Sequence, residues 1–223
     1  MPELILTFHG IGTPADSIGD EEKNYWATAD VFQKIIAEAA EFTARTGFGV
    51  LVTFDDGNKS DIAIGAPTLL QYGVPGFFFP CSGRVSDPAY LSQSDIRSLS
   101  ESGFGIGSHG IDHVKWPSLT PQQLDYELSQ SRLEIGEACG VEIVDAALPF
   151  GFYDSKVLRA LGSKGYKTIY SSDPGLSRAS DRFRRRYSYR SDRGIDIPSL
   201  IRKFEAPFFR GKSRVKHVLK SWR

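Results

Sequence analysis

Short runs of apolar residues alternate with longer amphipathic segments along most of the chain. Seven of these runs have the length of a buried strand, and they lie at residues 4–8, 48–54, 76–79, 104–108, 141–148, 166–171 and 184–189. Alternation of this kind is typical of β-α-β units with a parallel sheet. The pattern therefore predicts an α/β protein, specifically a distorted (β/α) barrel of about seven strands.

Capping residues mark where the helices between these strands begin and end. Thr28 is expected to cap a helix that runs to Gly47, and Thr120 is expected to cap the long helix that reaches Cys139. Ser60 is expected to cap a further helix. These helices would cover the outer face of the barrel.

The basic residues are concentrated near the end of the chain. Residues 182–223 hold 14 of the 27 Lys and Arg against three acids, although the formal net charge of the 223 residues is zero. We expect a barrel over residues 1–200 and a basic amphipathic tail over 201–223. The tail either packs on the barrel or lies on an anionic membrane surface, and simple neutralisation of the acidic part of the chain is the further alternative.

Composition places the chain among globular proteins, with 40% hydrophobic and 24% charged residues. Two cysteines do not indicate a disulfide framework. No run approaches the roughly 18 apolar residues of a membrane-spanning helix, and residues 1–6 lack the basic start of a signal peptide. As written, the chain is expected to be cytoplasmic, with peripheral membrane association or a removed leader as alternatives. No nucleic-acid partner is expected.

Two adjacent carboxylates, Asp55 and Asp56, follow the apolar run at 48–54. Side chains of neighbouring strand residues point to opposite faces, so the two carboxylates are expected to do different jobs. The simpler alternative is that one caps the next helix while the other faces water.

Two histidines, His109 and His113, follow the apolar run at 104–108 with a spacing of four residues. A helical turn or a tight loop can bring both imidazoles to one ion, although a lone pair at this spacing is usually accidental. With one of the two carboxylates they form the ligand set of a catalytic divalent site, of which zinc is the commonest occupant. The other carboxylate is then free to take a proton from attacking water.

Taken in order, these motifs resemble those of the polysaccharide deacetylases of carbohydrate esterase family four, the group with the chitooligosaccharide (NodB) homology domain. The resemblance covers roughly residues 4–190. It is closest in pattern to deacetylases of poly-N-acetylglucosamine, and it implies a NodB-like deacetylase barrel. Residues 53–57 match the first motif of the family, which implies that Asp55 is the catalytic base and Asp56 a metal ligand.

The segment at 109–113 is similar to the second motif of the family. This similarity implies that His109 and His113 bind the metal beside the ligand aspartate. The family usually has Ser or Thr where Gly110 stands, so a hydrogen bond that would hold the loop is expected to be missing.

The resemblance assigns three more residues. Phe150 belongs to a Leu-Pro-Phe-Gly segment like the third motif, which implies that its backbone N–H donates to the oxyanion. Arg is often found where Ala147 stands; subgroups without it draw an arginine from a later strand, which makes Arg186 the candidate, unless it covers a sheet edge. Asp173 resembles the fourth-motif aspartate that orients the base through that arginine, or else begins an ordinary Asp-Pro-Gly turn.

The fifth motif, which supplies a histidine that protonates the leaving amine, is not evident. His217 is the only histidine further along the chain, and it lies in the basic tail. His9 ends the first predicted strand, on the same rim as the other motifs. We expect His9 to line the site, with a packed structural role as the alternative.

The prediction is a metal-dependent hydrolase, with Zn²⁺ as cofactor, that removes N-acetyl groups from a polysaccharide or other glycan. A glycan O-acetyl esterase, a cyclic-amide hydrolase of the same fold and a non-catalytic glycan-binding module remain open. Aromatic residues near the motifs are expected to stack on sugar rings. These residues are Trp26, Trp116, Phe150, Phe152 and Tyr153, of which the two tryptophans fit the core equally well.

Overall fold

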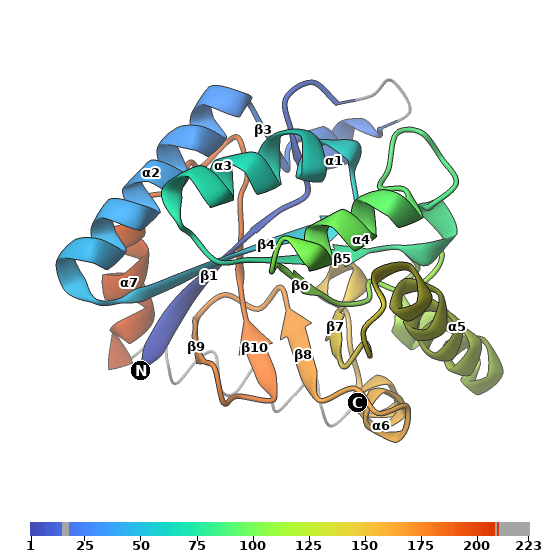
Figure 1. Ribbon diagram of the computed structural model, residues 1–223. Helices are drawn as coiled ribbons and strands as arrows, with labels where there is room; N and C mark the ends of the chain where they lie inside the picture. The colour runs from blue at the N-terminus through green and yellow to red at the C-terminus, as the bar shows by residue number, and fades with distance from the viewer. Residues whose placement is uncertain (15–17, 208, 210–223) are drawn as a thin grey trace.

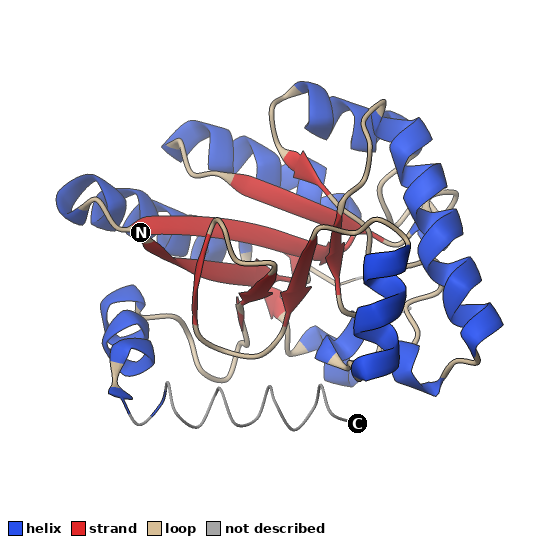
Figure 2. Ribbon diagram, turned by 90° about the horizontal axis from the view of Figure 1, so that it is seen from below, coloured by secondary structure: helices blue, strands red, loops and turns tan. Residues whose placement is uncertain are grey.

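The computed structural model describes residues 1–14, 18–207 and 209. Its strands lie inside, and its helices lie around them (Figure 1 and Figure 2). The main strands are β1 (Pro2–Phe8), β4 (Gly49–Asp56), β5 (Gly76–Pro80), β6 (Gly105–Ile106), β7 (Asp145–Ala147), β8 (Thr168–Ser171), β10 (Phe183–Arg185) and β11 (Tyr187–Ser188). The main helices are α2 (Ala29–Thr46), α3 (Ala66–Tyr72), α4 (Gln93–Glu101), α5 (Pro121–Cys139), α6 (Ser155–Ser163) and α7 (Ile197–Glu205). Each of the seven predicted apolar runs overlaps at least one of these strands.

The strands close into a ring. Parallel pairing gives one sheet in the order β11-β1-β4-β5-β6 and a second in the order β10-β8-β7. A parallel bridge between Ser108 and Ala146 joins the two sheets on one side. On the other side, β10 and β11 are separated by Arg186 alone, where the chain leaves β8 and pairs with β1. The predicted distorted (β/α) barrel is confirmed, but the single strand expected at 184–189 is two short strands.

Caps form as expected at two of the three positions. The hydroxyl of Thr28 accepts a hydrogen bond from the third residue of α2, and Thr120 forms a reciprocal capping box at the start of α5. Ser60 does not cap a helix, because its hydroxyl accepts the N–H of Ile11 instead. The segment after it is a π-helical turn over Asp61–Gly65, and α3 begins only behind this turn.

Four short elements are not indicated by the apolar pattern. They are β2 (Gly10–Ile11), α1 (Asp20–Lys23), β3 (Trp26–Ala27) and β9 (Leu176–Arg178), which pairs antiparallel with β1. A Cβ atom on Gly10 would lie 2.2 Å from the indole of Trp26. Glycine at this position therefore lets the Trp26 ring lie directly on the backbone of β2.

The inside of the barrel has an apolar cluster and a polar layer. Ile5, Leu51, Phe79, Ala147 and Tyr170 form the apolar cluster. The polar layer consists of Thr7, Thr53, Asp55, Ser171 and Arg186, each 1% exposed or less. Polar groups buried this deeply are stable only when they are paired. The hydroxyls of Thr7 and Thr53 lie 2.9 Å apart, and Arg186 donates to Thr53, to Asp55 and to the carbonyl of Ser171.

The C-terminal part of the described chain packs on the barrel. Helix α7 buries Ile197, Leu200, Ile201 and Phe204, and the boundary predicted at residue 200 falls inside it. Residues 210–223 of the predicted basic amphipathic tail, including His217, lie outside the described residues. Among the described helices, none is both long and apolar enough to cross a bilayer. Cys81 and Cys139 are buried free thiols.

Candidate metal centre and active site

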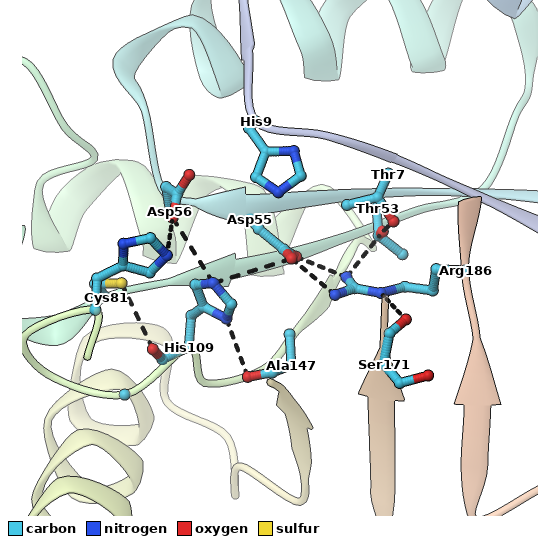
Figure 3. Close-up of polar contacts among 12 residues, drawn as sticks. Thr7, His9, Thr53, Asp55, Asp56, Cys81, His109, Ala147, Ser171 and Arg186 are labelled. Atoms are coloured by element: carbon cyan, nitrogen blue, oxygen red, sulfur yellow. Dashed lines mark hydrogen bonds and ion pairs between the residues drawn. The ribbon is translucent and has the colours of Figure 1, made fainter. Parts of the chain in front are cut away.

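The predicted site residues gather at the carboxyl ends of the strands, where the chemistry of a (β/α) barrel is usually placed. Figure 3 shows that Asp55 points towards Arg186, whereas Asp56 points towards His109. The expectation that adjacent strand carboxylates point apart therefore describes their arrangement well. His9, at the end of β1, faces the same region.

Backbone strain is concentrated in this region. Asp56, His113 and Phe150 have φ values of 74°, 51° and 56°, and they are the non-glycine residues with positive φ among those that the structure describes. The left-handed conformation costs a non-glycine residue about 1–2 kcal/mol. All three residues are predicted site residues, and strain of this kind persists where function requires the geometry.

One carboxylate and two imidazoles form a group that can hold a metal ion. Ligand atoms of Asp56, His109 and His113 all lie within 4.8 Å of one another. Oδ1 of Asp56 is 3.1 Å from Nε2 of His113 and 3.7 Å from Nε2 of His109. This oxygen is buried and has no hydrogen-bond partner. An unpaired buried carboxylate oxygen is costly, and a cation shared with the two nitrogens would remove that cost.

Hydrogen bonding fixes which nitrogen of His109 faces the group. Nδ1 lies 3.0 Å from the carbonyl oxygen of Ala147. Since a carbonyl only accepts, Nδ1 carries the hydrogen, and the lone pair of Nε2 is directed at Asp56. Burial lowers the pKa of His109 to about 3 and that of His113 to about 4. Both imidazoles are therefore neutral near pH 7, which is the form that binds metals.

Asp55 forms a buried, two-point ion pair with Arg186. The two guanidinium nitrogens lie 2.6 and 2.7 Å from the two carboxylate oxygens, and Arg186 also donates to Oγ1 of Thr53 and to the carbonyl of Ser171. Burial alone raises the pKa of Asp55, but the charge and the hydrogen bonds of Arg186 help to lower it to about 2. Asp55 is thus an ionised carboxylate, with Oδ2 4.0 Å from Nε2 of His109.

Arg186 enters the barrel at the break between β10 and β11. Its guanidinium lies 5.6 Å from the ring centre of Phe79 and 5.8 Å from that of Tyr170. Ala147 packs in the same apolar cluster as these rings. An arginine from a later part of the chain, Arg186, therefore lies next to Asp55, in the region of Ala147 where the family often has an arginine.

A carboxylate from α5 holds the loop between the two histidines. Glu127 accepts the backbone N–H of Ile111 at 2.8 Å and that of Asp112 at 3.3 Å. Gly110 has a φ of 82°, and a Cβ there would lie 2.6 Å from Oε2 of Glu127. Glu127 therefore anchors the loop, although Gly110 lacks the hydroxyl that the family usually has at this position. The sequence analysis did not identify Glu127. Its signal would have been a charged residue at a position of α5 that faces the core, beside the buried Leu128.

The predicted aromatic residues separate into a core set and a surface set. Trp116 is fully buried and Tyr153 is 5% exposed, so both belong to the core. Phe150 and Phe152 are about half exposed, and the ammonium of Lys115 lies over both rings. The Phe150 ring centre is also 4.3 Å from that of His113, which places this aromatic surface beside the candidate metal group.

A pocket of about 480 Å³ opens above these groups. His9, Trp26, Asp56, His113 and Phe150 are among its lining residues. The buried Nδ1 of His9 has no hydrogen-bond partner. The pocket is large enough for a sugar ring and reaches the carboxylate of Asp56.

Asp173 is buried next to this site. It is 3% exposed and accepts a hydrogen bond from the hydroxyl of Tyr153 at 2.7 Å. Burial and this bond raise the pKa of Tyr153. That Asp173 orients Asp55 through Arg186 stays a prediction.

The fold and the site together define a (β/α) barrel whose strand ends carry a buried His/Asp group suited to a divalent cation, beside a second, ionised carboxylate. The sequence model for polysaccharide deacetylases matches residues 43–169. The chain therefore belongs to the polysaccharide deacetylase family.

Individual relatives agree with this assignment. YxkH of Bacillus subtilis, named as a polysaccharide deacetylase, is 29% identical over 128 residues, which are 57% of this chain and 46% of YxkH. The chitooligosaccharide deacetylase of Azorhizobium caulinodans is 22% identical over 63% of this chain and 66% of its own length. The chain thus spans between about half and two thirds of these curated relatives.

A solved structure supports the fold over almost the whole chain. The deacetylase PplD of Streptococcus pyogenes, in complex with acetate, superposes with a TM-score of 0.76 at 16% identity. The match covers 93% of this chain and 99% of PplD. The barrel architecture is therefore that of the deacetylase family.

Proposed function

We propose that the protein is a divalent-metal-dependent deacetylase that hydrolyses acetyl groups on a glycan. The observation that carries the proposal is the buried Oδ1 of Asp56, which has no hydrogen-bond partner and lies between two neutral imidazoles, with the ionised Asp55 at the neighbouring position of the strand. Family membership supports the same reaction. A binding module would gain nothing from a buried free base beside a metal site.

Asp56, His109 and His113 are the proposed ligands, and Zn²⁺ is the proposed ion because two imidazoles and one carboxylate suit it. A divalent ion there would supply Lewis-acid activation of water and of the acetyl carbonyl. The fixed tautomer of His109 supports its ligand role, since the hydrogen on Nδ1 is held by the carbonyl of Ala147.

Asp55 is the proposed general base. Its carboxylate takes the proton of the attacking water, and the two-point contact with Arg186 keeps it ionised and correctly oriented. Asp173 is proposed to help hold the guanidinium of Arg186 in position, and through it the carboxylate of Asp55. The backbone N–H of Phe150, placed by a strained φ of 56°, is proposed to donate to the oxyanion.

His9 is the proposed donor of a proton to the leaving amine. It lines the pocket, and its imidazole has a buried nitrogen without a partner. We expect His9→Ala to lower kcat for an N-acetyl sugar by about 100-fold, because an amine leaves poorly without a proton. An activated aryl acetate needs no such proton, so its turnover should change less than about threefold. Equal losses on both substrates, or no loss on either, would remove His9 from this role.

Glu127 is expected to act through the metal loop. Glu127→Gln retains the size of the side chain but keeps only one acceptor oxygen for the two loop N–H groups. We expect zinc affinity to fall by about 10- to 100-fold, as is usual when a supporting contact of a ligand is lost. Glu137→Gln, an exposed change on the same helix, is the matched control and should leave the affinity unchanged. An unaltered dissociation constant for zinc in E127Q would contradict the anchoring role.

Amide and ester substrates are separated by one experiment. The protein with one equivalent of zinc is given an N-acetylated oligosaccharide and the matching O-acetylated one, and released acetate is measured. We expect turnover of the N-acetyl compound. Release from the O-acetyl compound alone would replace the deacetylase by a glycan esterase, and release from neither would contradict the proposed function.

A further inference from the structure

We infer that Arg84 competes with the metal ion for the carboxylate of Asp56, and that this competition sets how much free metal the protein needs before its site is filled. The inference rests on the proposed function, because it concerns the regulation of the same metal centre. It is carried by the position of the Arg84 guanidinium beside the proposed ligands and by the way in which the chain holds it there.

The guanidinium of Arg84 lies against the oxygen atom that the metal would use. Nη1 of Arg84 is 3.7 Å from Oδ1 of Asp56. The same oxygen faces Nε2 of His109 and Nε2 of His113. A separation of 3.7 Å is too long for a hydrogen bond, so the contact is an attraction between charges. Among the described residues, Arg84 forms no other ion pair. Without metal, Asp56 thus has a positive partner that leaves the lone pairs of Oδ1 open.

The backbone that carries Arg84 is fastened to the loop that carries the two histidines. Arg84 ends a short 3-10 turn, Ser82–Arg84, that follows β5. In this turn, the N–H of Ser82 donates to the carbonyl of Gly110 at 3.0 Å, and the next N–H donates to the carbonyl of Ile111 at 3.2 Å. The turn is therefore held next to the metal loop, so an entering ion can displace the side chain of Arg84 but not its backbone.

The side chain of Arg84 has a second contact and room to move. Its guanidinium lies 4.8 Å from the centre of the Tyr90 ring, and 24% of the side chain is exposed. It lines the same pocket as Asp56 and His113, and Glu22 lines that pocket as well. The cation–π contact with Tyr90 can thus hold the guanidinium when it turns away from Asp56 towards the open pocket.

Two positive groups on one carboxylate oxygen repel each other. Zinc binds carboxylate oxygens at about 2.0–2.2 Å, so an ion on Oδ1 would lie at most about 6 Å from Nη1 of Arg84. Like charges at this distance in a partly buried site repel appreciably. The same charge reaches His113: burial lowers the pKa of His113 to about 4, and Arg84 adds to this effect. The centre should therefore bind a divalent ion more weakly than its three ligands alone would.

The zinc affinity of Arg84 variants tests the inference. The metal-stripped protein competes for zinc with a coloured chelator of known affinity near neutral pH, and the absorbance of the chelator gives the dissociation constant. Arg84→Gln and Arg84→Met remove the charge, so we expect both to bind zinc about tenfold more tightly. Arg84→Lys keeps the charge and should stay within about threefold of the unaltered protein. Arg159→Gln, an exposed change on α6 outside the pocket, is the control and should leave the constant unchanged.

Zinc binding by the two neutral variants that is equal to that of the unaltered protein, or weaker, overturns the inference. Acetate release from an N-acetylated oligosaccharide at saturating zinc tests the proposed function separately. Tighter zinc binding by the neutral variants without acetate release from any of the proteins overturns the proposed function alone. Zinc binding by none of them overturns both.

Discussion

Replacement of Asp55 by asparagine is expected to lower kcat for acetate release by about 10²- to 10⁴-fold, the usual contribution of a general base. Asparagine has nearly the same shape and still accepts hydrogen bonds from Arg186, but it cannot take a proton from water. The measurement is acetate release at saturating substrate. The zinc content should stay at one equivalent, because Asp56, His109 and His113 are unchanged.

Asp56→Asn is the matched comparison, since it alters the neighbouring carboxylate on the other side of the strand. There the zinc affinity should fall, and part of the activity should return at high zinc concentration. Activity of D55N within about threefold of the unaltered protein would show that another group takes the proton. A loss of zinc from D55N would show that the roles of the two aspartates are reversed.

Replacement of Arg186 by methionine should lower the free energy of unfolding by about 3–5 kcal/mol, the usual cost of leaving one partner of a buried ion pair alone. Asp55, which is 1% exposed, would then be an unpaired buried charge. Urea unfolding of the zinc-free protein measures this, since zinc binding would otherwise add its own stabilisation. Arg186→Lys keeps the charge but loses the two-point contact, so we expect an intermediate loss.

The double variant D55N/R186M separates the ion pair from simple packing. If the loss in R186M comes from the stranded carboxylate, D55N/R186M should be more stable than R186M, because no buried charge remains. If the losses in unfolding free energy of D55N and R186M add up to the loss of the double variant, Asp55 and Arg186 are not coupled.

The barrel was accessible from the sequence because its strands are buried on both faces. Runs such as residues 48–54 are apolar except for Thr53, and a buried parallel strand needs such a run. The break at Arg186 was not accessible. It depends on the pairing of β10 with β8, more than ten residues earlier, and of β11 with β1, at the other end of the chain.

The candidate site was accessible as residue types and spacing, because carboxylates and imidazoles at strand ends have few structural uses. Its fine geometry was not. Positive φ at Asp56 and at His113 has no sequence marker, since neither residue is a glycine. Glu127 anchors the loop through the N–H groups of Ile111 and Asp112, and this tertiary contact depends on how α5 packs against a loop about 16 residues earlier in the chain. Trp116 fitted both the site and the core by sequence, and its full burial assigns it to the core.

Ser60 illustrates how a tertiary contact overrides a local preference. A serine before a helical pattern is usually a cap, but here its hydroxyl binds the backbone of β2, 49 residues away. Without the cap, the helix begins as a π-helical turn. This turn follows β4, which ends in the two aspartates, after a short loop, and turns of this kind are frequent near functional sites.

The central claim is that hydrolysis requires one divalent ion held by Asp56, His109 and His113. The most direct test is a titration of the metal-stripped protein with zinc while acetate release from an N-acetylated oligosaccharide is recorded. We expect no release without metal and a linear rise that ends at one zinc per chain, with His113→Ala shifted to far higher zinc concentrations. Acetate release at the full rate from the metal-stripped protein would contradict the account.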